Sequence, residues 1–522
     1  MEKAGLYLKW VRRLIKLLFS RVVLVAICIL LQIAYLIIAI WQFSQYFAYT
    51  QMVLTLLSFI VVIHIINDKS NPAYKLAWIV PIMAFPIFGG LFYIFFGGNK
   101  AGRRIQKKLT GLMETTEAMS SRESPVIAQL DELDPRVALQ ARYIQDCAMY
   151  STWTNTTVKY HPSGEEQFED LKAELEKAEH YIFLEYFIIH EGIFWDTILE
   201  ILVRKAREGV DVRLIYDDLG CVVLLPYGYD RKLEKLGIQC KVFNPFVPFI
   251  AVRMNNRDHR KIVVIDGHTA FTGGINLADE YINAYEKFGH WKDTGVMVKG
   301  EAVWNFTVMF LTLWDFLTKK REPDYERFRP QVYHPEPFAG EGFVAPFTDS
   351  PMDGEAVGEN VYYNLIAHAC RYVYITTPYL ILDYEMTNAL CTAAKSGVDV
   401  RIITPHVWDK FMVYMLTQSN YPALLEAGVK IYEYTPGFVH AKSFVVDDEL
   451  ATVGTINLDY RSLYLHFECG CWMYKTSAVM DIKEDLLKTM EECHCFTMED
   501  YRRLPLYRRL GGKLLKLFAP LL

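Results

Sequence analysis

The hydrophobic pattern divides the chain into an apolar N-terminal part and a longer part in which short apolar runs alternate with amphipathic ones. Residues 22–41 carry no charge, and residues 49–66 form a second apolar run. Each run is long enough to cross a hydrocarbon core of about 30 Å as a helix. We therefore expect two transmembrane helices, at about 22–41 and 49–66, in a membrane region that covers residues 1–108.

A third apolar stretch, residues 76–96, is poorly suited to a straight spanning helix because it contains Pro81, Pro86 and the Gly89-Gly90 pair. Basic residues precede the first run, and a stronger basic cluster follows this stretch, at Lys100, Arg103, Arg104, Lys107 and Lys108. Basic flanks stay on the cytoplasmic side of a membrane. The pattern therefore predicts two spans with both ends in the cytoplasm, and a re-entrant or interfacial segment at 76–96.

From about residue 150 short β-branched runs alternate with amphipathic ones, which is the pattern of an α/β protein. A strand is predicted over 180–189, a helix over 195–209 and a strand over 210–217. The succession then returns, because "REGVDVRLIYD" at 207–217 corresponds to "KSGVDVRIITP" at 395–405. The predicted fold class is α/β, with one unit built twice and the two halves packed about a pseudo-twofold axis.

Composition gives the domain boundaries. Residues 321–351 hold six prolines, which is typical of a linker. Residues 501–522 hold six Lys or Arg and no acidic residue, with Leu and Phe between them; such a tail suits either an anionic membrane surface or packing on the domain. We expect, in order, the membrane region, a linker (109–149), a first half (150–320), a Pro-rich linker (321–351), a second half (352–500) and a basic amphipathic tail (501–522).

The pattern HxKxxxxDxxxxxxGxxN occurs twice with identical spacing. Its members are His259, Lys261, Asp266, Gly273 and Asn276 in the first copy and His440, Lys442, Asp447, Gly454 and Asn457 in the second. One copy should arise by chance in roughly one chain of this length in 10⁴, so the repeat indicates function. The glycines, followed by Gly274 and Thr455, are expected to let backbone approach a ligand closely.

Both copies have strand character, and side chains two residues apart in a strand share a face. His259 and Lys261 are therefore expected to point the same way, as are His440 and Lys442. Two imidazoles, two ammonium groups and two amides that converge suit a phosphate diester. One imidazole attacks phosphorus, the other protonates the leaving alcohol, and the ammonium groups neutralise the phosphate oxygens. This scheme needs no metal or other cofactor.

Charge and cysteine usage narrow the alternatives. The net charge is −6, so no global basic field recruits nucleic acid. The ten cysteines mostly stand singly, as expected of reduced cytosolic thiols. The cluster Cys493-His494-Cys495 fits no familiar zinc spacing, and we predict no metal site there.

At these residues the sequence resembles the phospholipase D superfamily, whose defining feature is the doubled motif, over roughly residues 150–495. The segments that follow the two motifs, "HWKDTGVMVKG" (290–300) and "NLDYRSLYLHFE" (457–468), are similar to those of bacterial cardiolipin synthases. An N-terminal segment, residues 71–97, and the closing residues 517–522 also resemble that family. The resemblance implies phospholipase D-type mixed-sheet halves and a two-step transfer that makes cardiolipin and glycerol from two phosphatidylglycerol molecules. It implies that His259 is the nucleophile, that His440 is the acid/base, and that the phosphate is held by Lys261, Lys442, Asn276 and Asn457.

The resemblance also assigns the carboxylates. Asp266 and Asp447 belong to the catalytic motif, but five residues beyond the lysine they are expected to face away and brace the loop and strands. Asp293 and Glu468 match the positions that orient the imidazoles. The chain departs from the family pattern at His466, where Asn is commoner, and in "GGIN" and "GTIN", where Ser often follows the glycine.

Several functions share these catalytic residues. A phospholipase D hydrolase would let water accept the phosphatidyl group, and another transferase would use a different donor or acceptor. A membrane scaffold with a dead site is disfavoured because both motifs are intact. The implied partners are phosphatidylglycerol and anionic membrane lipid, with no nucleic acid, and the expected location is a bacterial cell membrane with a cytoplasmic catalytic domain. The sequence makes no prediction of oligomeric state.

Overall fold

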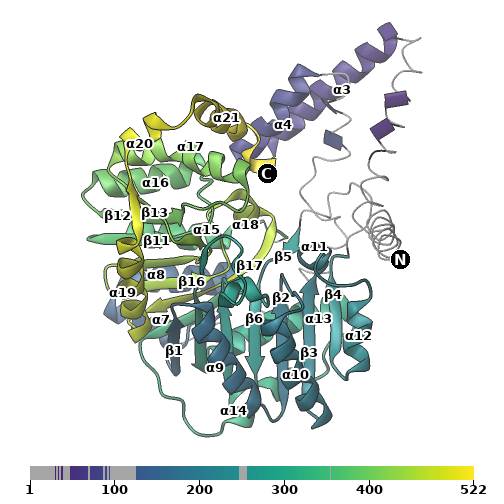
Figure 1. Ribbon diagram of the computed structural model, residues 1–522, viewed down its shortest axis with the longest axis vertical. Coiled ribbons are helices and arrows are strands. Elements are labelled where there is room, and N and C mark those ends of the chain that lie inside the picture. Colours follow the sequence, from purple (N-terminus) through teal and green to yellow (C-terminus); the bar gives the residue numbers. More distant parts are fainter. Residues whose placement is uncertain are drawn as a thin grey trace, which may run out of the picture.

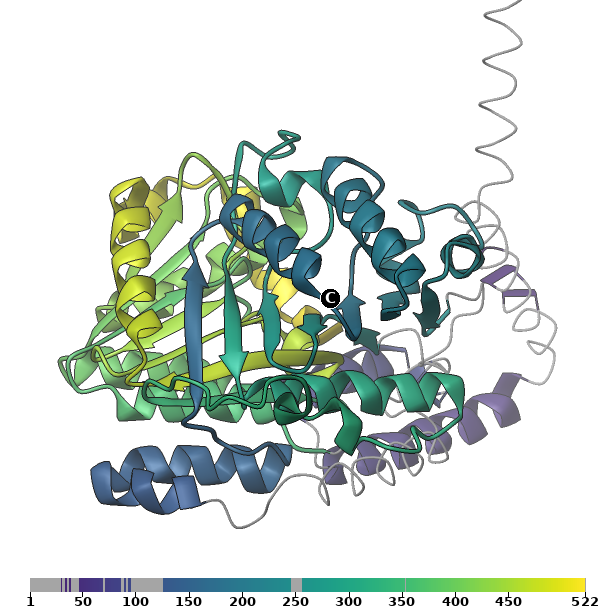
Figure 2. The same ribbon diagram turned by 90° about the horizontal axis from the view of Figure 1, so that it is seen from below.

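Two mixed sheets, one from each half of the chain, lie beside each other and make up most of the molecule (Figures 1 and 2). The computed structural model describes residues 30, 33–34, 37–38, 47–68, 71–85, 89–90, 93–94, 125–245, 256–352 and 354–521. The first half is coloured from blue to teal and the second from green to yellow.

The first half consists of β1 (Thr156–His161), α9 (Gly164–Lys177), β2 (Tyr181–Tyr186), α10 (Ile193–Arg207), β3 (Asp211–Asp217), α11 (Asp218–Cys221), α12 (Tyr229–Lys235), β4 (Gln239–Phe243), β5 (Arg257–Asp258), β6 (Lys261–Ile265), β7 (Thr269–Gly273), β8 (His290–Lys292), β9 (Gly295–Gly300) and α13 (Val303–Thr318). The predicted strands over 180–189 and 210–217 correspond to β2 and β3, and the predicted helix over 195–209 corresponds to α10. The strands β2 and β6 are buried at every position, as expected for central strands covered on both faces.

The second half consists of β10 (Phe343–Asp349), α15 (Val357–His368), β11 (Tyr372–Thr376), α16 (Tyr384–Lys395), β12 (Asp399–Pro405), α17 (Phe411–Ala427), β13 (Lys430–Tyr434), β14 (Gly437–Val439), β15 (Ser443–Val446), β16 (Leu450–Gly454), α18 (Tyr460–Tyr464), β17 (His466–Tyr474), α19 (Ser477–Glu491) and β18 (Cys493–Phe496). The sheet orders are β1-β9-β7-β6-β2-β3-β4 and β10-β17-β16-β15-β11-β12-β13-β18. The second order repeats the first strand for strand and adds β18 at one edge, so each half builds the same mixed sheet.

A single apolar core joins the halves. Side chains from both sheets, such as Phe183 and Val445, pack in it together with the helices α13 and α19. The helix α13 is apolar on nearly all sides, which matches its position inside this core. Separate clusters lie between the first sheet and α9, α10 and α12, and between the second sheet and α15, α16 and α17.

Two predicted linkers contain structure. The Pro-rich linker over 321–351 was predicted too long, because residues 343–349 form β10, which pairs with β17 along its whole length. Pro346 is tolerated there because β10 is an edge strand, where a missing N–H breaks no ladder on the open side. The linker over 109–149 contains α7 (Pro125–Leu133), α8 (Pro135–Tyr143) and a π-helical turn (Ile144–Ala148), which pack on the second half.

The described N-terminal residues form α3 (Phe47–Asn67) and α4 (Pro72–Ala84), which pack together through Val61, Ile65 and Trp78. Within the described residues, no helix combines the length and the apolar run that crossing a membrane requires. The two predicted spans are therefore not confirmed, and most of the first, 22–41, lies outside the described residues.

After α4 the chain returns against the same two helices. A Cβ at Gly89 would lie 2.5 Å from Ile82 Cα, and one at Gly90 would lie 2.3 Å from Ser58 Oγ. The Gly-Gly pair therefore permits a close approach within the segment predicted to be re-entrant or interfacial.

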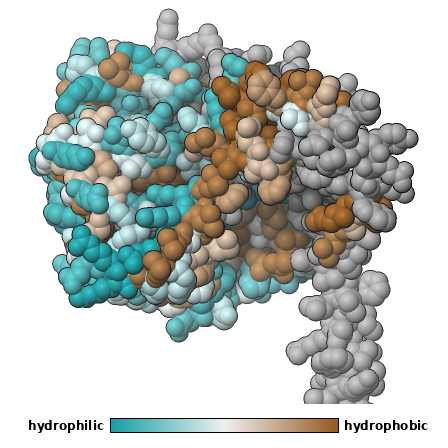
Figure 3. Space-filling model, turned by 90° about the horizontal axis from the view of Figure 1, so that it is seen from above, coloured by the Kyte–Doolittle hydropathy of each residue, from teal (hydrophilic) through white to brown (hydrophobic). Residues whose placement is uncertain are grey.

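The C-terminal helices α20 (Met498–Arg503) and α21 (Leu506–Lys516) lie on the second half, with α21 against α17. The closing turn, Ala519–Leu521, contacts both α4 and α18. Figure 3 views the face that carries α3, α4 and α21 and shows hydrophobic side chains gathered in a band across it.

Candidate active site

The two halves exchange short strands next to the motif histidines. The strand β5, which precedes His259, pairs in parallel with the start of β17 in the second half. The strand β14, which precedes His440, pairs in parallel with β8 in the first half. The backbone N–H of His259 donates to Phe467 O (2.9 Å), and that of His440 donates to Lys292 O (2.7 Å). Each catalytic histidine is thus positioned by backbone of the opposite half.

The same exchange supplies each imidazole with a carboxylate. His259 Nδ1 lies 3.0 Å from both Glu468 oxygens, and His440 Nδ1 lies 2.7 Å from Asp293 Oδ2. Both carboxylates are fully buried. An ionised carboxylate can only accept a hydrogen bond, so each Nδ1 carries the proton and each Nε2 is unprotonated. Lys442 Nζ lies 3.1 Å from His440 Nε2. The sequence pointed to both carboxylates, but it did not show that each one orients the histidine of the opposite half.

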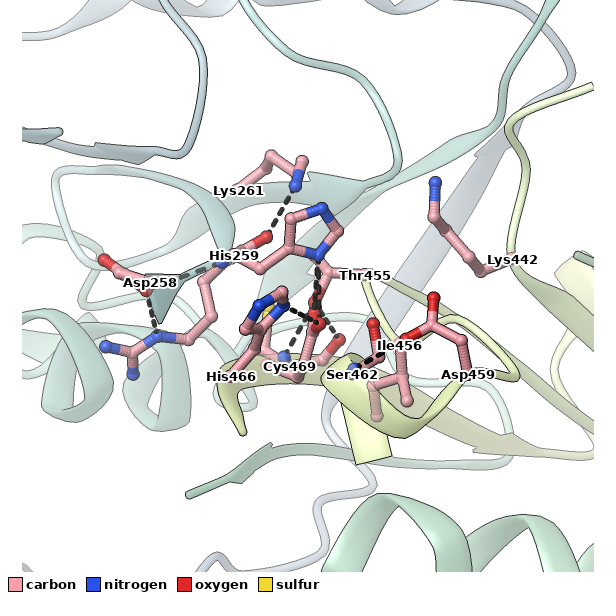
Figure 4. Close-up of polar contacts among 12 residues, drawn as sticks. Asp258, His259, Lys261, Lys442, Thr455, Ile456, Asp459, Ser462, His466 and Cys469 are labelled. Carbon is pink, nitrogen blue, oxygen red and sulfur yellow. Dashed lines mark hydrogen bonds and ion pairs between the residues drawn. The ribbon is translucent and has the colours of Figure 1, made fainter. Parts of the chain in front are cut away.

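The orienting carboxylates are themselves fixed. Thr455 Oγ1 donates to Glu468 Oε2, as the close-up around His259 and Thr455 shows (Figure 4). The Thr294 N–H donates to Asp293 Oδ1 (2.8 Å), and a Cβ at Gly274 would lie 2.0 Å from that oxygen. Gly274 and Thr455 are equivalent motif positions. The first leaves room for its carboxylate and the second holds its carboxylate with a hydroxyl.

The approach of a ligand to the backbone of the motif glycines stays a prediction, and the structure gives these glycines a second role. A Cβ at Gly273 would lie 2.4 Å from Thr294 O, and one at Gly454 would lie 2.4 Å from Cys469 O. Thr294 directly precedes β9, and Cys469 lies in β17, so both oxygens lie on or next to the strand that pairs with the glycine's own strand. The glycines therefore let the adjacent strand, which carries the orienting carboxylate, approach closely.

Substituting Gly274 should disturb His440 without touching it. In Gly274→Ala the Asp293 carboxylate must move, and a displacement of about 1 Å at a catalytic group costs roughly 10²-fold in rate. We expect kcat to fall by about that factor while the melting temperature changes little. Gly511→Ala is the matched control, because its Cβ would meet only Met415 at ordinary contact distances. Equal activity of the two variants would show that Gly274 does not position Asp293.

The two motif lysines are buried beside their histidines. Lys261 Nζ donates to His259 O and Lys442 Nζ donates to His440 O. Burial lowers the pKa of Lys261 to about 8 and that of Lys442 to about 7, although Glu468 and Asp293 oppose the shift. Figure 4 shows the ammonium groups of Lys261 and Lys442 on the upper side of the His259 ring. Neutralisation of a bound phosphate by these ammonium groups stays a prediction.

Burial also controls the histidines. It lowers the pKa of His259 to about 3 and that of His440 to about 4, although the paired carboxylates oppose it. For Glu468, burial is outweighed by His259, which holds the pKa of the carboxyl below its ordinary value. Both imidazoles are therefore neutral at pH 7 in the empty site. A neutral imidazole is what nucleophilic attack requires.

The motif aspartates lie at the other end of their strands. Asp266 accepts from the N–H groups of Glu179, His180 and Tyr181 at 2.7–2.9 Å. Asp447 accepts from those of Cys370, Arg371 and Tyr372 at 2.6–2.9 Å. Each carboxylate thus ties the end of one central strand to the start of its neighbour, and the carboxylates that bond to His259 and His440 are Glu468 and Asp293 instead.

The motif asparagines differ in their contacts. Asn276 accepts from the Ile188 N–H (3.0 Å) and donates to Tyr281 OH (2.8 Å), so its amide is engaged. Asn457 Oδ1 is buried and has no hydrogen-bond partner within the described residues. Both side chains line the same cavity as the histidines. Phosphate binding by the two amides stays a prediction.

A cavity of about 840 Å³ contains both histidines. Its aromatic wall was not predicted from the sequence: the ring of Phe187 lies 5.0 Å from that of His259, and those of Tyr281 and Trp291 lie 5.5 and 5.4 Å from that of His440. These rings remove water from the imidazoles, which explains the lowered pKa values. The sequence offered one hint of this wall: Tyr281 and Trp291 lie within a few residues of the predicted site residues Asn276 and Asp293.

Comparison with known proteins agrees with this geometry. Residues 171–314 and 362–491 match the family described as "Cardiolipin synthase, PLD-like domain", and residues 56–98 match "Phospholipase_D-nuclease N-terminal". A cardiolipin synthase of Geobacillus kaustophilus is 35% identical over 87% of this chain and 90% of its own length. One of Halalkalibacterium halodurans is 34% identical over 94% of this chain and 96% of its own.

Two further proteins are similar to the chain. An uncharacterised protein of Streptococcus mutans is 45% identical over 88% of this chain and 99% of its own length. The crystal structure of phosphatidylserine synthase from Haemophilus influenzae superposes with a TM-score of 0.53 at 17% identity, covering 70% of this chain and 93% of that one, which shows a shared fold. The doubled motif, its crossed carboxylates and these matches lead to one conclusion: the chain is an enzyme of the bacterial cardiolipin synthase family in the phospholipase D superfamily.

Proposed function

We propose that the chain is a membrane-bound phosphatidyltransferase that makes cardiolipin and glycerol from two phosphatidylglycerol molecules through a phosphohistidine intermediate. The observation that carries the proposal is the convergence of His259 and His440 in one cavity, each oriented by a carboxylate of the other half. A reciprocal arrangement of this kind is also what a pseudo-twofold relation between the halves would produce.

In the first step His259 Nε2 attacks phosphorus of the donor lipid. A P–N bond forms, the P–O bond to the headgroup glycerol breaks, and His440 Nε2 gives the leaving oxygen its proton. His440 has a low pKa in the empty site, so it must take up a proton when the anionic diester binds. The Asp293 carboxylate stabilises the resulting imidazolium.

In the second step a hydroxyl of the next phosphatidylglycerol attacks the phosphohistidine. A P–O bond forms, the P–N bond to His259 breaks, and the hydroxyl proton passes to His440. Lys261 and Lys442 neutralise the phosphate oxygens in both steps. The aromatic wall and the burial of the histidines favour the lipid hydroxyl over water, because water must be excluded for transfer to win.

We propose a membrane location from the surface beside the cavity. Exposed apolar side chains gather on α3, α4 and α21: Met52, Leu56, Phe59, Ile63, Ile66, Leu76, Val80, Met83, Phe85, Leu506, Leu510 and Leu514. An apolar patch of this extent marks a membrane or protein contact. The helix α21 adds Arg508, Arg509 and Lys513, which suit an anionic leaflet. Two spans with a cytoplasmic catalytic domain fit this arrangement.

The test uses the full-length protein in vesicles of phosphatidylglycerol, with lipid products and released glycerol quantified together. Cardiolipin formed one for one with glycerol is the expected result. Phosphatidic acid with glycerol would contradict the proposal and assign water as the acceptor. Neither product, also after phosphatidylethanolamine is added, would exclude phosphatidylglycerol as the donor.

The pH dependence of turnover should report the buried lysines. The proton that His440 must take up when lipid binds becomes scarcer as the pH rises above its pKa of about 4, and the lysine ammonium groups are lost as the pH passes about 7 to 8. We therefore expect kcat/KM to fall with rising pH and to fall more steeply above about pH 8. The alkaline fall in kcat should lie at higher pH than that in kcat/KM, because the phosphate of the bound lipid favours the charged form of each lysine. Steady-state rates measured from pH 6 to 10 in mixed micelles test this. An alkaline limb near the ordinary lysine value of about 10.4 would contradict it.

A further inference from the structure

A third imidazole lies beside the catalytic pair and has no part in the proposed mechanism. His466 begins β17, and Figure 4 shows it next to His259; the two ring centroids are 5.6 Å apart. Its Nδ1 is buried, lies 3.7 Å from Glu468 Oε1, and has no hydrogen-bond partner within the described residues. A buried polar atom without a hydrogen-bond partner is destabilising. A ligand that used this nitrogen would remove that cost.

The surroundings give His466 room to move. Its side chain lines the catalytic cavity and also a smaller cavity of about 260 Å³ on its other side. No hydrogen bond fixes its Nδ1. Rotation of the ring toward His259 and Glu468 would therefore break no hydrogen bond of Nδ1 and would shorten its 3.7 Å contact with Glu468.

One ligand atom from each of His259, His466 and Glu468 lies within 4.8 Å of the others. Two imidazoles and one carboxylate are a known donor set for zinc, with bonds of about 2.0–2.2 Å, so tetrahedral ligands lie about 3.4 Å apart. His259 Nδ1 is already 3.0 Å from Glu468. Roughly 1 to 1.5 Å of movement, mainly by His466, would complete three corners of a tetrahedron.

We propose that His259, His466 and Glu468 form a reversible binding site for a zinc-like divalent cation, and that the bound cation blocks phosphatidyl transfer. A metal bound at His259 Nδ1 leaves the single imidazole proton on Nε2, and a metal bound at Nε2 occupies that atom. In either case the nucleophilic lone pair is lost. The blocking effect rests on the proposed function, whereas the binding does not.

The electrostatics permit binding of moderate strength. Metal ligands must be deprotonated, and burial keeps the pKa of His259 well below its ordinary value. Glu468 contributes one negative charge to the donor set. The nearby Lys261 ammonium opposes a cation, so the affinity should lie below that of a structural zinc site. A site of this kind would respond to excess metal and release it to a chelator.

The test compares the wild type with His466→Asn, which puts the residue commoner in the family at this position, and with His466→Gln. Zinc binding is measured by equilibrium dialysis in detergent, and cobalt is used as a probe for its visible absorption in four-coordinate sites. We expect the wild type to bind one equivalent and to lose cardiolipin synthesis reversibly. Both variants should require at least about 10-fold more zinc for binding and for inhibition, each judged against its own metal-free rate.

The matched control is His494→Asn, because His494 lies between two cysteines outside the catalytic cavity, in a cluster that we do not expect to bind metal. His494 lies on the surface and pairs with Asp500 at 3.2 Å. This variant should bind zinc as the wild type does. Unchanged zinc binding in both His466 variants would overturn the site, and so would loss of binding in His494→Asn.

The two readouts separate the site from the proposed function. Metal binding through His466 in a protein that makes no cardiolipin would support the site and count against the function. A protein that makes cardiolipin but neither binds zinc nor is inhibited by it would overturn the site and leave the proposed function standing.

Discussion

Replacing His259 with alanine is expected to abolish cardiolipin formation, with a loss of about 10⁵-fold or more. The proposed intermediate is a bond to this imidazole, and removing one member of a catalytic unit costs nearly as much as removing the whole unit. Neither neighbouring group is placed to substitute, because Glu468 is fully buried and His466 Nδ1 contacts that carboxylate at 3.7 Å. The measurement is cardiolipin and glycerol release from phosphatidylglycerol in mixed micelles.

The control for this variant is His268→Ala. His268 lies in the turn that follows β6, outside the catalytic cavity; its ring lies 5.4 Å from that of His334, and its Nδ1 lies 3.2 Å from Thr269 Oγ1. Both variants should elute and melt as the wild type does within a few degrees. Residual activity of a few per cent in His259→Ala would rule out its role as the nucleophile.

Replacing Glu468 with glutamine should reduce kcat by roughly 10³- to 10⁴-fold. The carboxylate can only accept a hydrogen bond from His259 Nδ1, whereas the glutamine amide can donate one. Donation places the imidazole proton on Nε2, the atom that must attack phosphorus. Asp293→Asn should act in the same way on His440. Because each carboxylate belongs to the opposite half, both variants test the crossed arrangement.

Glu433→Gln is the matched control for a buried carboxylate. Glu433 is 1% exposed and accepts from Tyr414, Tyr421 and Gln418, but it does not line the catalytic cavity. We expect it to lower the melting temperature while kcat stays within about twofold of the wild type. If Glu468→Gln also lost only stability, the carboxylate would have no orienting role.

Much of the site could be predicted because the motif is local and repeated. The spacing placed His259 with Lys261 and His440 with Lys442, and the resemblance located Asp293 and Glu468. The crossing of carboxylates between halves could not be read from spacing. It depends on β5 pairing with β17 and β14 pairing with β8, which are contacts between segments far apart in the sequence.

The fold was predicted where periodicity was strong and missed where composition misled. The repeated strand and helix pattern gave two α/β halves, and both sheets have the same strand order. The proline content hid β10, because an edge strand accepts Pro346 without losing a ladder bond. The motif glycines were predicted to admit a ligand, and the approach of a neighbouring strand, which also requires Gly273 and Gly454, was not predicted.

The most direct test of the two-step mechanism uses a phosphatidyl ester of 4-nitrophenol, whose leaving group needs no general acid. His440→Ala should release about one equivalent of nitrophenol in a rapid burst and then stop, because the phosphohistidine forms but the acceptor hydroxyl cannot be deprotonated. His259→Ala should give no burst. Alkaline quenching preserves the acid-labile P–N bond, and mass spectrometry should locate the phosphatidyl group on His259. A burst in His259→Ala with none in His440→Ala, or no covalent adduct in either, would contradict the mechanism.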